Sequence, residues 1–525
     1  MKQRLLNWFF AHKPFLLYLF LTASIRFWNF HNTLFFIWDQ GRDAWKLREI
    51  AAGNLTLVGP TSGLHGFFLG PLWYYVGVPG YWLSGGNPYG IGLWYIFLAC
   101  LALPLFWHLA HQLFAHKKQA IVTAYFLALA PGSIEGSLQI WNPLLAIPLM
   151  AGALAAFFAA RNSRLALAAG FFLLACTLQA EFAYAVFFIL PMFLAIPWIR
   201  QKVDWRDFVV SGLSVGVTGI PQLAFELRNN WIMTRSLLQG LADTEKLVSW
   251  KILAQTRPLQ LFSATRNLLL SNIPWGTVPG LLILACVVGA MYLLLKSKKQ
   301  TDYKWKIVTL FALIPYAFFL IWRGNYGNFF AYYLTPHFIF LIPLVVYGLT
   351  HLKDFLPEIV FTRSSLKPPL VAAGLTGLLL YGIWHTLAGR ILFIENNAGL
   401  ATIERAIERV YTWSESDAIS PTNMRVYTPN GMTEQYDYVL HWYARKHNLP
   451  VARTSRSADD PVWYVILEPA ASDTAARFHF APWYAETSQG GILVRREQVG
   501  VLVVETWMEP NRAMENGLLP APTEE

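Results

Sequence analysis

Eleven apolar runs, most of them long enough to cross a bilayer, dominate the first 390 residues and restrict what the chain can fold into. A transmembrane helix needs about 20 consecutive apolar residues, and one soluble core cannot hide many such runs from water. Across the whole chain 55% of the residues are hydrophobic and 14% are charged, whereas soluble domains carry about 25% charged residues. The sequence therefore predicts a membrane protein and argues against a soluble enzyme.

The runs alternate with short polar connections. They lie at Pro14 to Phe30, Ile91 to Phe114, Ala120 to Pro131, Leu144 to Ala160, Leu165 to Leu178, Phe182 to Ile199, Phe208 to Phe225, Val278 to Leu295, Ile307 to Trp322, Tyr332 to Thr350 and Pro369 to Leu387. Two of them are short, so the expected number of spans is eleven, within about two. We expect an all-α polytopic membrane domain over residues 1–390.

Charge divides the chain into two parts. Residues 1–390 contain 30 Lys and Arg against 13 Asp and Glu, and residues 391–525 contain 11 against 18. In the first part the basic residues gather in alternate connections, such as 200–206, 296–306 and 353–367. Cytoplasmic loops carry such an excess, so we expect a plasma (inner) membrane protein with a cytoplasmic N-terminus and, for an odd number of spans, a tail outside. No basic stripe typical of nucleic-acid binding is present.

Residues 391–525 predict a small soluble α/β domain on the extracytoplasmic side. Helical patterns cover Ala401 to Trp413 and Glu434 to His447, and β-like runs cover Met424 to Tyr427, Val462 to Leu467 and Gly491 to Thr506. The domain contains no glycine-rich phosphate loop and no zinc pattern. A role in docking or in recognition of an acceptor is a hypothesis only.

Two of the expected outer loops are long. The first, residues 31–87, contains Trp38-Asp-Gln-Gly-Arg-Asp-Ala-Trp45, a helical stretch to Gly53 and an aromatic segment, Gly66 to Tyr75. Trp and Tyr favour the headgroup level of a bilayer, so we expect this loop along the membrane surface. The second loop, 228–275, holds six basic residues that could contact anionic headgroups or form a solvated charged face. They are Arg228, Arg235, Lys246, Lys251, Arg257 and Arg266.

Carboxylates are scarce on the expected outer side. Eight are available: Asp39, Asp43, Glu49, Glu135, Glu181, Glu226, Asp243 and Glu245. Asp39 is the strongest candidate for chemistry, because it follows the first span and lies three residues before Arg42. A carboxylate beside a cation can stay ionised and accept a proton. The alternative, with equal weight, is that Asp39 caps the helix that starts here.

Four motifs of the membrane part of the chain resemble those of a known family. Asp39-Gln40-Gly41-Arg42-Asp43, about thirty residues before Gly70-Pro-Leu-Trp-Tyr-Tyr75 and a Gly85-Gly-Asn-Pro88 turn, resembles the first outer loop of GT-C glycosyltransferases. It is most similar to bacterial members of glycosyltransferase family 39, which are related to protein O-mannosyltransferases and lipid A aminoarabinose transferases. Ala331-Tyr-Tyr-Leu-Thr-Pro336 is similar to a motif that begins a late span of the family. The resemblance covers roughly residues 10–350, and it rests on the order and spacing of the motifs.

The resemblance implies transfer of a sugar, with inversion, from a polyprenyl-phosphate carrier to an acceptor on the outer side. The acceptor would be a lipid, a glycan or a protein, and Asp39 matches the family's catalytic base. The second acid of the family's pair is Gln40 here, so its role is missing or has moved to Asp43, which would share a helix face with Asp39 if one helix includes both. Asp39, Asp43 and His65 could hold a divalent metal ion, although an unrelated histidine is the commoner arrangement.

Further candidates for substrate binding accompany these carboxylates. They are Arg42, His65, Asn142, Gln179, Glu181, Arg323, Tyr332 and Tyr333. Glu181 lies at a junction between apolar runs, where an unpaired charge is costly and so suggests function. Arg323 could bind a departing phosphate. The tyrosines could equally anchor the interface, and Asn142 could belong to a turn that enters a span.

Two other functions remain open at this stage. A transporter or flippase of lipid-linked sugars would have inverted repeats and polar breaks in the middle of spans. No convincing repeat is seen, and the polar candidates concentrate in outer loops. The absence of the second acid also leaves open an inactive relative that only binds lipid-linked sugar. Neither the sugar nor the acceptor can be predicted.

Overall fold

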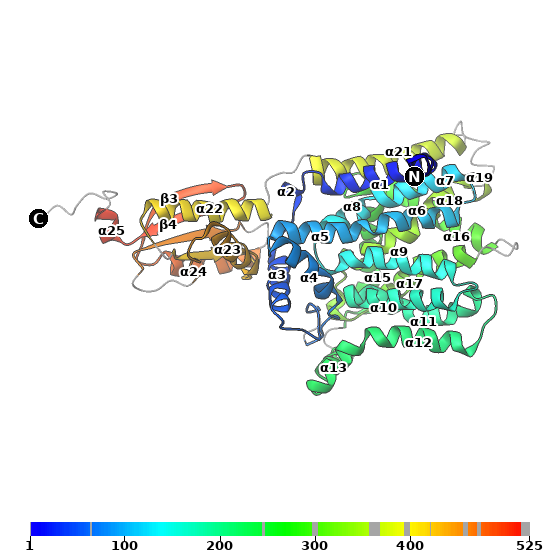
Figure 1. Ribbon diagram of the computed structural model, residues 1–525, viewed down its shortest axis with the longest axis horizontal. Coiled ribbons are helices and arrows are strands. Elements are labelled where there is room, and N and C mark those ends of the chain that lie inside the picture. Colours follow the sequence, from blue (N-terminus) through cyan, green and yellow to red (C-terminus); the bar gives the residue numbers. More distant parts are fainter. Residues whose placement is uncertain are drawn as a thin grey trace, which may run out of the picture. The chain divides into compact units, whose positions relative to one another are not determined.

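The computed structural model describes most of the chain: residues 2–62, 66–243, 247–296, 303–355, 368–392, 399–419, 422–454, 460–469 and 474–515. Two compact units make up the molecule (Figure 1). The helical unit contains Met1–Trp28, Leu55–Val76 and Tyr95–Leu392. The α/β unit contains Asn29–Asn54, Gly77–Trp94 and Phe393–Glu525, so two segments of the first long loop region cluster with the tail.

The helical unit is a bundle in which every predicted apolar run is helical. Its helices are α1 (Lys2–Phe27), α6 (Ala102–Leu113), α7 (Lys117–Leu129), α8 (Pro131–Leu138), η1 (Asn142–Leu145), α9 (Ala146–Ala159), α10 (Arg164–Ala180), α11 (Phe182–Ile199), α12 (Trp205–Thr218), α13 (Ile220–Arg228), α14 (Ile232–Ala242), α15 (Trp250–Leu270), α16 (Thr277–Lys296), α17 (Tyr303–Ile321), η3 (Asn325–Gly327), η4 (Ala331–His337), α18 (Phe338–Thr350), α19 (Leu352–Phe355), α21 (Pro368–Leu387) and η5 (Ala388–Leu392). Helices α4 (Leu72–Ser84) and α5 (Pro88–Cys100) run from one unit into the other.

Length and composition select the helices that could cross a membrane. Among the described residues seven helices are long and apolar enough, and two bent pairs, α7 with α8 and α12 with α13, bring the number to nine if each pair is one span. Helix α10 is apolar but has only 17 residues. The predicted multi-pass, all-α membrane architecture is confirmed, whereas the number eleven stays a prediction.

Two buried arginines donate hydrogen bonds to the ends of other helices in this bundle. Arg26 donates to the carbonyl of Ala128 at 2.8 Å and to the hydroxyl of Ser133 at 2.9 Å, across the break between α7 and α8. Arg257, on α15, donates at 2.9 Å to the carbonyl of Phe319 near the end of α17. Terminal helix carbonyls lack partners within their own helix, so each arginine satisfies a group that apolar neighbours cannot.

Arg257 also corrects an expectation about the second long loop. Its side chain is buried, with 1% exposure, and does not belong to a solvated charged face. Helix α15 packs against α8, α17 and α21, so this part of the predicted loop is an integral helix of the bundle. Lys246 and Glu245, from the same loop, lie outside the described residues.

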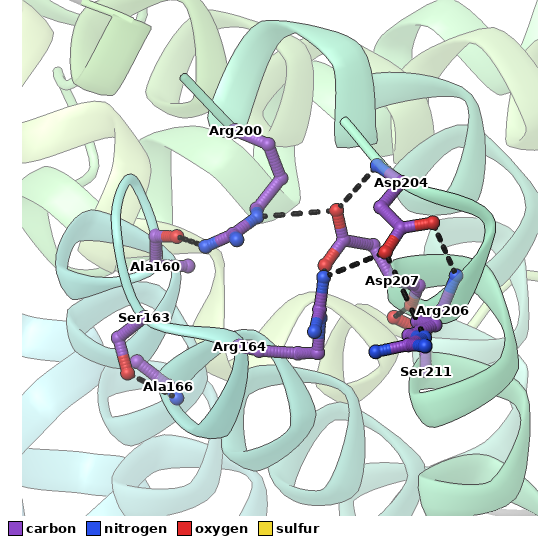
Figure 2. A network of polar contacts seen from close by, with 9 residues as sticks. All are labelled: Ala160, Ser163, Arg164, Ala166, Arg200, Asp204, Arg206, Asp207 and Ser211. Atoms are coloured by element: carbon purple, nitrogen blue, oxygen red, sulfur yellow. Dashed lines mark hydrogen bonds and ion pairs between the residues drawn. The ribbon is translucent and has the colours of Figure 1, made fainter. Parts of the chain in front are cut away.

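An ion-pair network joins three neighbouring helices at one end (Figure 2). Asp207, on α12, is fully buried and pairs with Arg164 at the start of α10, at 2.8 Å, and with Arg200 just after α11, at 3.3 Å. Arg200 also donates to the carbonyl of Ala160 at 2.6 Å, and Asp204 accepts from Arg164 at 3.2 Å. Because α10, α11 and α12 run alongside one another (Figure 1), the network fixes their ends together.

The α/β unit contains a mixed sheet, and the tail forms the small α/β fold that its sequence predicts. Its elements are α2 (Phe30–Thr33), α3 (Trp38–Ala51), α22 (Leu400–Ser416), β1 (Met424–Tyr427), α23 (Glu434–His447), β2 (Val462–Leu467), α24 (Thr474–Ser488), β3 (Ile492–Val499), β4 (Leu502–Met508) and α25 (Pro510–Glu515). The strand order is β1-β2-β4-β3, with β1 parallel to β2 and the other pairs antiparallel. The small α/β fold is confirmed. The run 491–506 is a hairpin that turns at Gly500, whose φ is +62°.

Helices cover both faces of this sheet. On one face, Trp463 and Val465 pack against Trp483 and Tyr484 of α24, a helix that the sequence did not predict. On the other, Tyr464 donates a hydrogen bond to Asp417, which follows α22. Residues alternate between the two faces along β2, and every residue of that strand is buried. The sheet is thus the core of a three-layer α/β/α arrangement.

Candidate active site

Helix α3 carries the first group of predicted site residues and is capped by Gln40. The side-chain oxygen of Gln40 accepts a hydrogen bond from the amide of Ile37 at 2.9 Å. Ile37 is the N-cap residue, and Asp39 lies inside the first turn. The interpretation of Asp39 as the helix cap is therefore wrong. The residue that departs from the family's acid pair instead supplies part of the cap.

Asp39 shares a cation with Asp43, and we call Asp39, Arg42 and Asp43 the Asp39 cluster. Arg42 Nη1 lies 2.9 Å from Asp39 Oδ1, and Arg42 Nη2 lies 2.7 Å from Asp43 Oδ1. The guanidinium of Arg42 also lies 5.1 Å from the centre of the Trp38 ring. The side chain of Asp43 is 5% exposed, whereas that of Asp39 is 18% exposed. Asp39 is thus the more accessible of the two carboxylates.

Several opposing effects determine how strongly Asp39 holds its proton. Burial is the largest and raises the pKa of the Asp39 carboxyl, while Arg42 lowers it. The negative charges of Asp43 and of Glu434, at the start of α23, raise the pKa again, and the result is about 6. A carboxylate with this pKa is ionised at neutral pH yet is a stronger base than an exposed aspartate.

Glu434 was not among the predicted site residues. It lies 395 positions after Asp39 in a part of the chain that the family resemblance does not cover. A carboxylate in the first turn of a helix is ordinary, since it complements the helix dipole. No signal in the sequence distinguishes this one.

A second group of predicted residues lies in the helical unit, at the break between α10 and α11. Glu181 occupies the break and is 5% exposed. Asn142 Nδ2 donates to the carbonyl of the preceding residue, Ala180, at 2.6 Å. The carboxylate of Glu181 is close enough to Tyr333 to interact with it electrostatically. Glu181 and the Asp207 network lie at opposite ends of α10 and α11, because these two helices meet at Glu181.

Tyr333, which interacts with Glu181, belongs to a group of aromatic rings that contact one another. The rings of Trp141 and Tyr332 are 4.7 Å apart, and those of Tyr332 and Tyr333 are 4.8 Å apart. We call Trp141, Asn142, Glu181, Tyr332 and Tyr333 the aromatic–carboxylate cluster. Its tyrosines come from η4, a 3-10 helix that precedes α18, and so this predicted run does not begin as an α-helix. Ring faces beside a buried carboxylate suit a polyol with apolar C–H faces.

Gln179 and Arg323 have backbone partners. Gln179 accepts from the amide of Leu72 at 3.2 Å and donates to the carbonyl of Thr218 at 2.5 Å, so its amide joins three segments of the helical unit. Arg323 Nε donates to the carbonyl of Val248 at 2.8 Å, and its guanidinium lies 4.8 Å from the centre of the Trp250 ring. These contacts hold both side chains in place.

The predicted metal site is only partly covered by the structure. Within the described ranges, no group of three or more His, Cys, Asp and Glu residues could hold a metal ion. His65, the third member of the predicted set, lies outside the described residues. The two aspartates of the set are paired with Arg42, and nothing in their geometry identifies them as metal ligands.

Solved structures share the fold of this chain. The apo structure of ArnT from Cupriavidus metallidurans has a TM-score of 0.55 and 13% identity, over 94% of this chain and 98% of that one. ArnT bound to undecaprenyl phosphate has a TM-score of 0.56 and 12% identity, with the same coverage. This chain has the GT-C fold. The GT-C architecture predicted from the loop motifs is thereby confirmed.

A weaker structural similarity is found to an archaeal protein. It is the oligosaccharyltransferase AglB from Archaeoglobus fulgidus, in complex with an inhibitory peptide and a dolichol-phosphate. Its TM-score is 0.46 and its identity 13%, over 94% of this chain and 74% of that one. No protein-family model matches the sequence.

Proposed function

We propose that this protein is an integral-membrane glycosyltransferase that moves a sugar from a polyprenyl-phosphate carrier to an extracytoplasmic acceptor. The observation that carries the proposal is Asp39: a partly buried carboxylate, held by Arg42, whose pKa of about 6 suits a general base. The GT-C fold supports it, since ArnT, which shares this fold, has been solved with undecaprenyl phosphate bound.

In this mechanism the acceptor hydroxyl attacks the anomeric carbon of the sugar while Asp39 takes its proton. The bond between the anomeric carbon and the phosphate oxygen breaks, and the lipid phosphate leaves with the bonding electrons. Attack from the face opposite the leaving group inverts the configuration of that carbon. Arg42 keeps Asp39 ionised before the attack. In the helical unit, Arg323 is proposed separately as a phosphate-binding residue, because a guanidinium pairs well with a phosphate.

The aromatic–carboxylate cluster is proposed as the sugar-binding part of the helical unit. Tyr332 and Trp141 offer ring faces for the C–H groups of a sugar, and Glu181 offers oxygens to its hydroxyls. The positive-inside rule assigns the connections that carry Arg164 and Arg200 to the cytoplasm. Because Glu181 is at the other end of the same helices, this orientation assigns the cluster to the outer side.

The replacement of Asp39 by Asn tests the proposal directly. Membranes that contain the folded variant would be supplied with a panel of labelled polyprenyl-phosphate sugars, and transfer to endogenous acceptors would be measured. Loss of a general base lowers the rate by at least about a hundredfold. Glu49→Gln is the matched control, because Glu49 lies on the same helix and is half exposed. Transfer at the wild-type rate by the Asp39→Asn variant overturns the proposal.

The same assay separates the other candidate functions. Labelled carrier that crosses the bilayer without transfer would identify a flippase. Carrier that binds without transfer or movement would identify an inactive relative. Either result, obtained with the wild-type protein and the full panel of sugars, contradicts the proposal that this protein is a glycosyltransferase.

A further inference from the structure

Helices α3 and α23 lie against each other within the α/β unit, with their first turns together. Gly41, in the first turn of α3, has no room for a side chain: a Cβ there would collide with the carbonyl of Glu434 and the amide nitrogen of Gln435. Only glycine allows two helix backbones to approach this closely without a shift of one of them. The first turn of α23 is therefore fixed beside the turn that carries Asp39.

Aromatic contacts set the register of the two helices. The Trp45 ring meets Tyr438 edge-on at 5.4 Å and His441 at 5.0 Å. Trp45 lies one turn after Gly41, and Tyr438 one turn after Glu434, so the helices run parallel. The hydroxyl of Tyr438 donates to the carbonyl of Gly86 at 2.8 Å, which ties α23 to a second segment of the same unit.

One oxygen of Glu434 has no hydrogen-bond donor among the described residues. Oε2 of Glu434 is buried and unsatisfied, as is the side-chain oxygen of Gln435 next to it. In contrast, Arg42 donates to Asp43 Oδ1 from Nε at 2.9 Å and from Nη2 at 2.7 Å. A buried carboxylate oxygen without a donor is costly. A side chain that only stabilised the fold would be expected to have one.

We propose that Glu434 is a positioning residue of the candidate active site, through which the tail tunes Asp39 as a base. This inference rests on the proposed function. It makes the α/β unit part of the catalytic apparatus, since a residue of the tail acts on the base across the contact between α3 and α23. It also gives this chain a carboxylate near Asp39 that, unlike Asp43, does not pair with Arg42.

The charged and titratable groups around Asp39 can be named for both helices. On α3 they are Arg42 and Asp43, followed by Arg48 further along the helix. On α23 they are Glu434, then Asp437, His441 and Arg445. Of these, Arg42, Asp43 and Glu434 act on Asp39, and only Arg42 favours its ionised form. Removal of the Glu434 charge should therefore make Asp39 a weaker base that ionises at lower pH.

The test is the pH dependence of transfer by the Glu434→Gln variant, measured in membranes with labelled polyprenyl-phosphate sugar as donor. We expect the acidic limb of the rate profile to move to lower pH by about half a unit, because one like charge has been removed. Glu497→Gln removes the same charge from β3 of the same unit, where Glu497 pairs with Arg409 at 2.9 Å. This control should leave the limb in place.

Glu434→Asp retains the charge but moves it one methylene away, so its limb should lie between those of the wild type and Glu434→Gln. It also serves as the test variant if Glu434→Gln does not fold, as judged by thermal unfolding in detergent. An unmoved limb in a folded Glu434 variant, together with an inactive Asp39→Asn variant, overturns this inference and leaves the proposed function standing. Wild-type transfer by Asp39→Asn overturns the proposed function itself.

Discussion

Asp39 and Arg42 lie one turn apart on α3 and form an ion pair with 2.9 Å between Oδ1 and Nη1. An arginine at this distance normally lowers the pKa of a carboxyl. Here the pKa of Asp39 is nevertheless raised to about 6, because burial and two neighbouring carboxylates outweigh the arginine. The pair therefore holds the carboxylate in position without removing its basicity, which is the compromise that a general base needs.

The first prediction concerns the pH dependence of the wild-type protein. The base form of Asp39 is required, so transfer should be constant well above pH 6 and should decline tenfold per pH unit well below it. The measurement is the initial rate of transfer in membranes between about pH 4.5 and pH 8.5. A rate that does not change down to pH 4.5 would contradict a base with this pKa.

The second prediction is that Arg42→Gln moves the acidic limb to higher pH by about one unit, since Asp39 loses the cation that favours its ionised form. The direction is opposite to that expected for Glu434→Gln, and opposite shifts cannot arise from a general loss of stability. Arg42→Lys retains the charge, so the acidic limb of its rate profile should stay near that of the wild type. A downward shift in Arg42→Gln would show that the pair does not control Asp39.

Sequence patterns predicted the elements of the fold well, because hydropathy and alternation report directly on burial. The expected strands 424–427 and 462–467 agree with β1 and β2, and the expected helix 434–447 agrees with α23. Prediction failed where burial depends on a distant partner. Helix α15 contains Arg257 and other polar residues, and the carbonyls of Phe319 and Gly327, far along the chain, account for that arginine inside the bundle.

The residues of the candidate site likewise fall into those that the sequence could identify and those that it could not. Asp39 and Arg42 could be found because they are neighbours in a short motif, and their ion pair follows from helical spacing. Asn142 and Glu181 could be named one by one from their positions between apolar runs, but their proximity depends on how the helices pack. Glu434 could not be found, because its proximity to the Asp39 motif depends on the close packing of Gly41 against α23, which the sequence does not reveal.

The third prediction concerns the helix cap at Gln40. Gln40→Ala removes the acceptor of the Ile37 amide and should lower the free energy of unfolding by about 1 kcal/mol. Gln40→Glu retains an acceptor oxygen and should keep the stability. Its added charge beside Asp39 should also move the acidic limb to higher pH. Thermal unfolding in detergent and the rate profile measure the two effects. Equal stability of all three proteins would contradict a capping role.

The fourth prediction concerns the ion-pair network of Figure 2. Asp207→Asn leaves the nearly buried Arg200 without its carboxylate and should lower the free energy of unfolding by about 3 kcal/mol. Arg206→Gln is the control on the same helix. Its side chain is 64% exposed and lies 3.9 Å from Asp204, so a change below about 0.5 kcal/mol is expected. Similar losses of unfolding free energy in both variants would show that the buried ion pairs of Asp207 contribute no more to stability than an exposed pair.

The last prediction separates a substrate-binding role of Glu181 from a purely structural one. Glu181→Gln is nearly isosteric, and the KM for a labelled polyprenyl-phosphate sugar should rise about tenfold, since an amide replaces the carboxyl group in its hydrogen bonds to the sugar hydroxyls. Tyr332→Phe retains the ring and removes only the hydroxyl, so it should have a smaller effect than Tyr332→Ala if the ring face carries the contact.

The acidic limb of the rate profile should stay in place in these three variants, because Asp39 is unchanged. This distinguishes them from the Arg42 and Glu434 variants, whose limbs are expected to move. An unchanged KM in the folded Glu181→Gln protein would remove Glu181 from the proposed sugar site. Since the assignment of Asp39 as base does not depend on Glu181, that result would leave the catalytic proposal intact and would move the search for the sugar contacts to other residues.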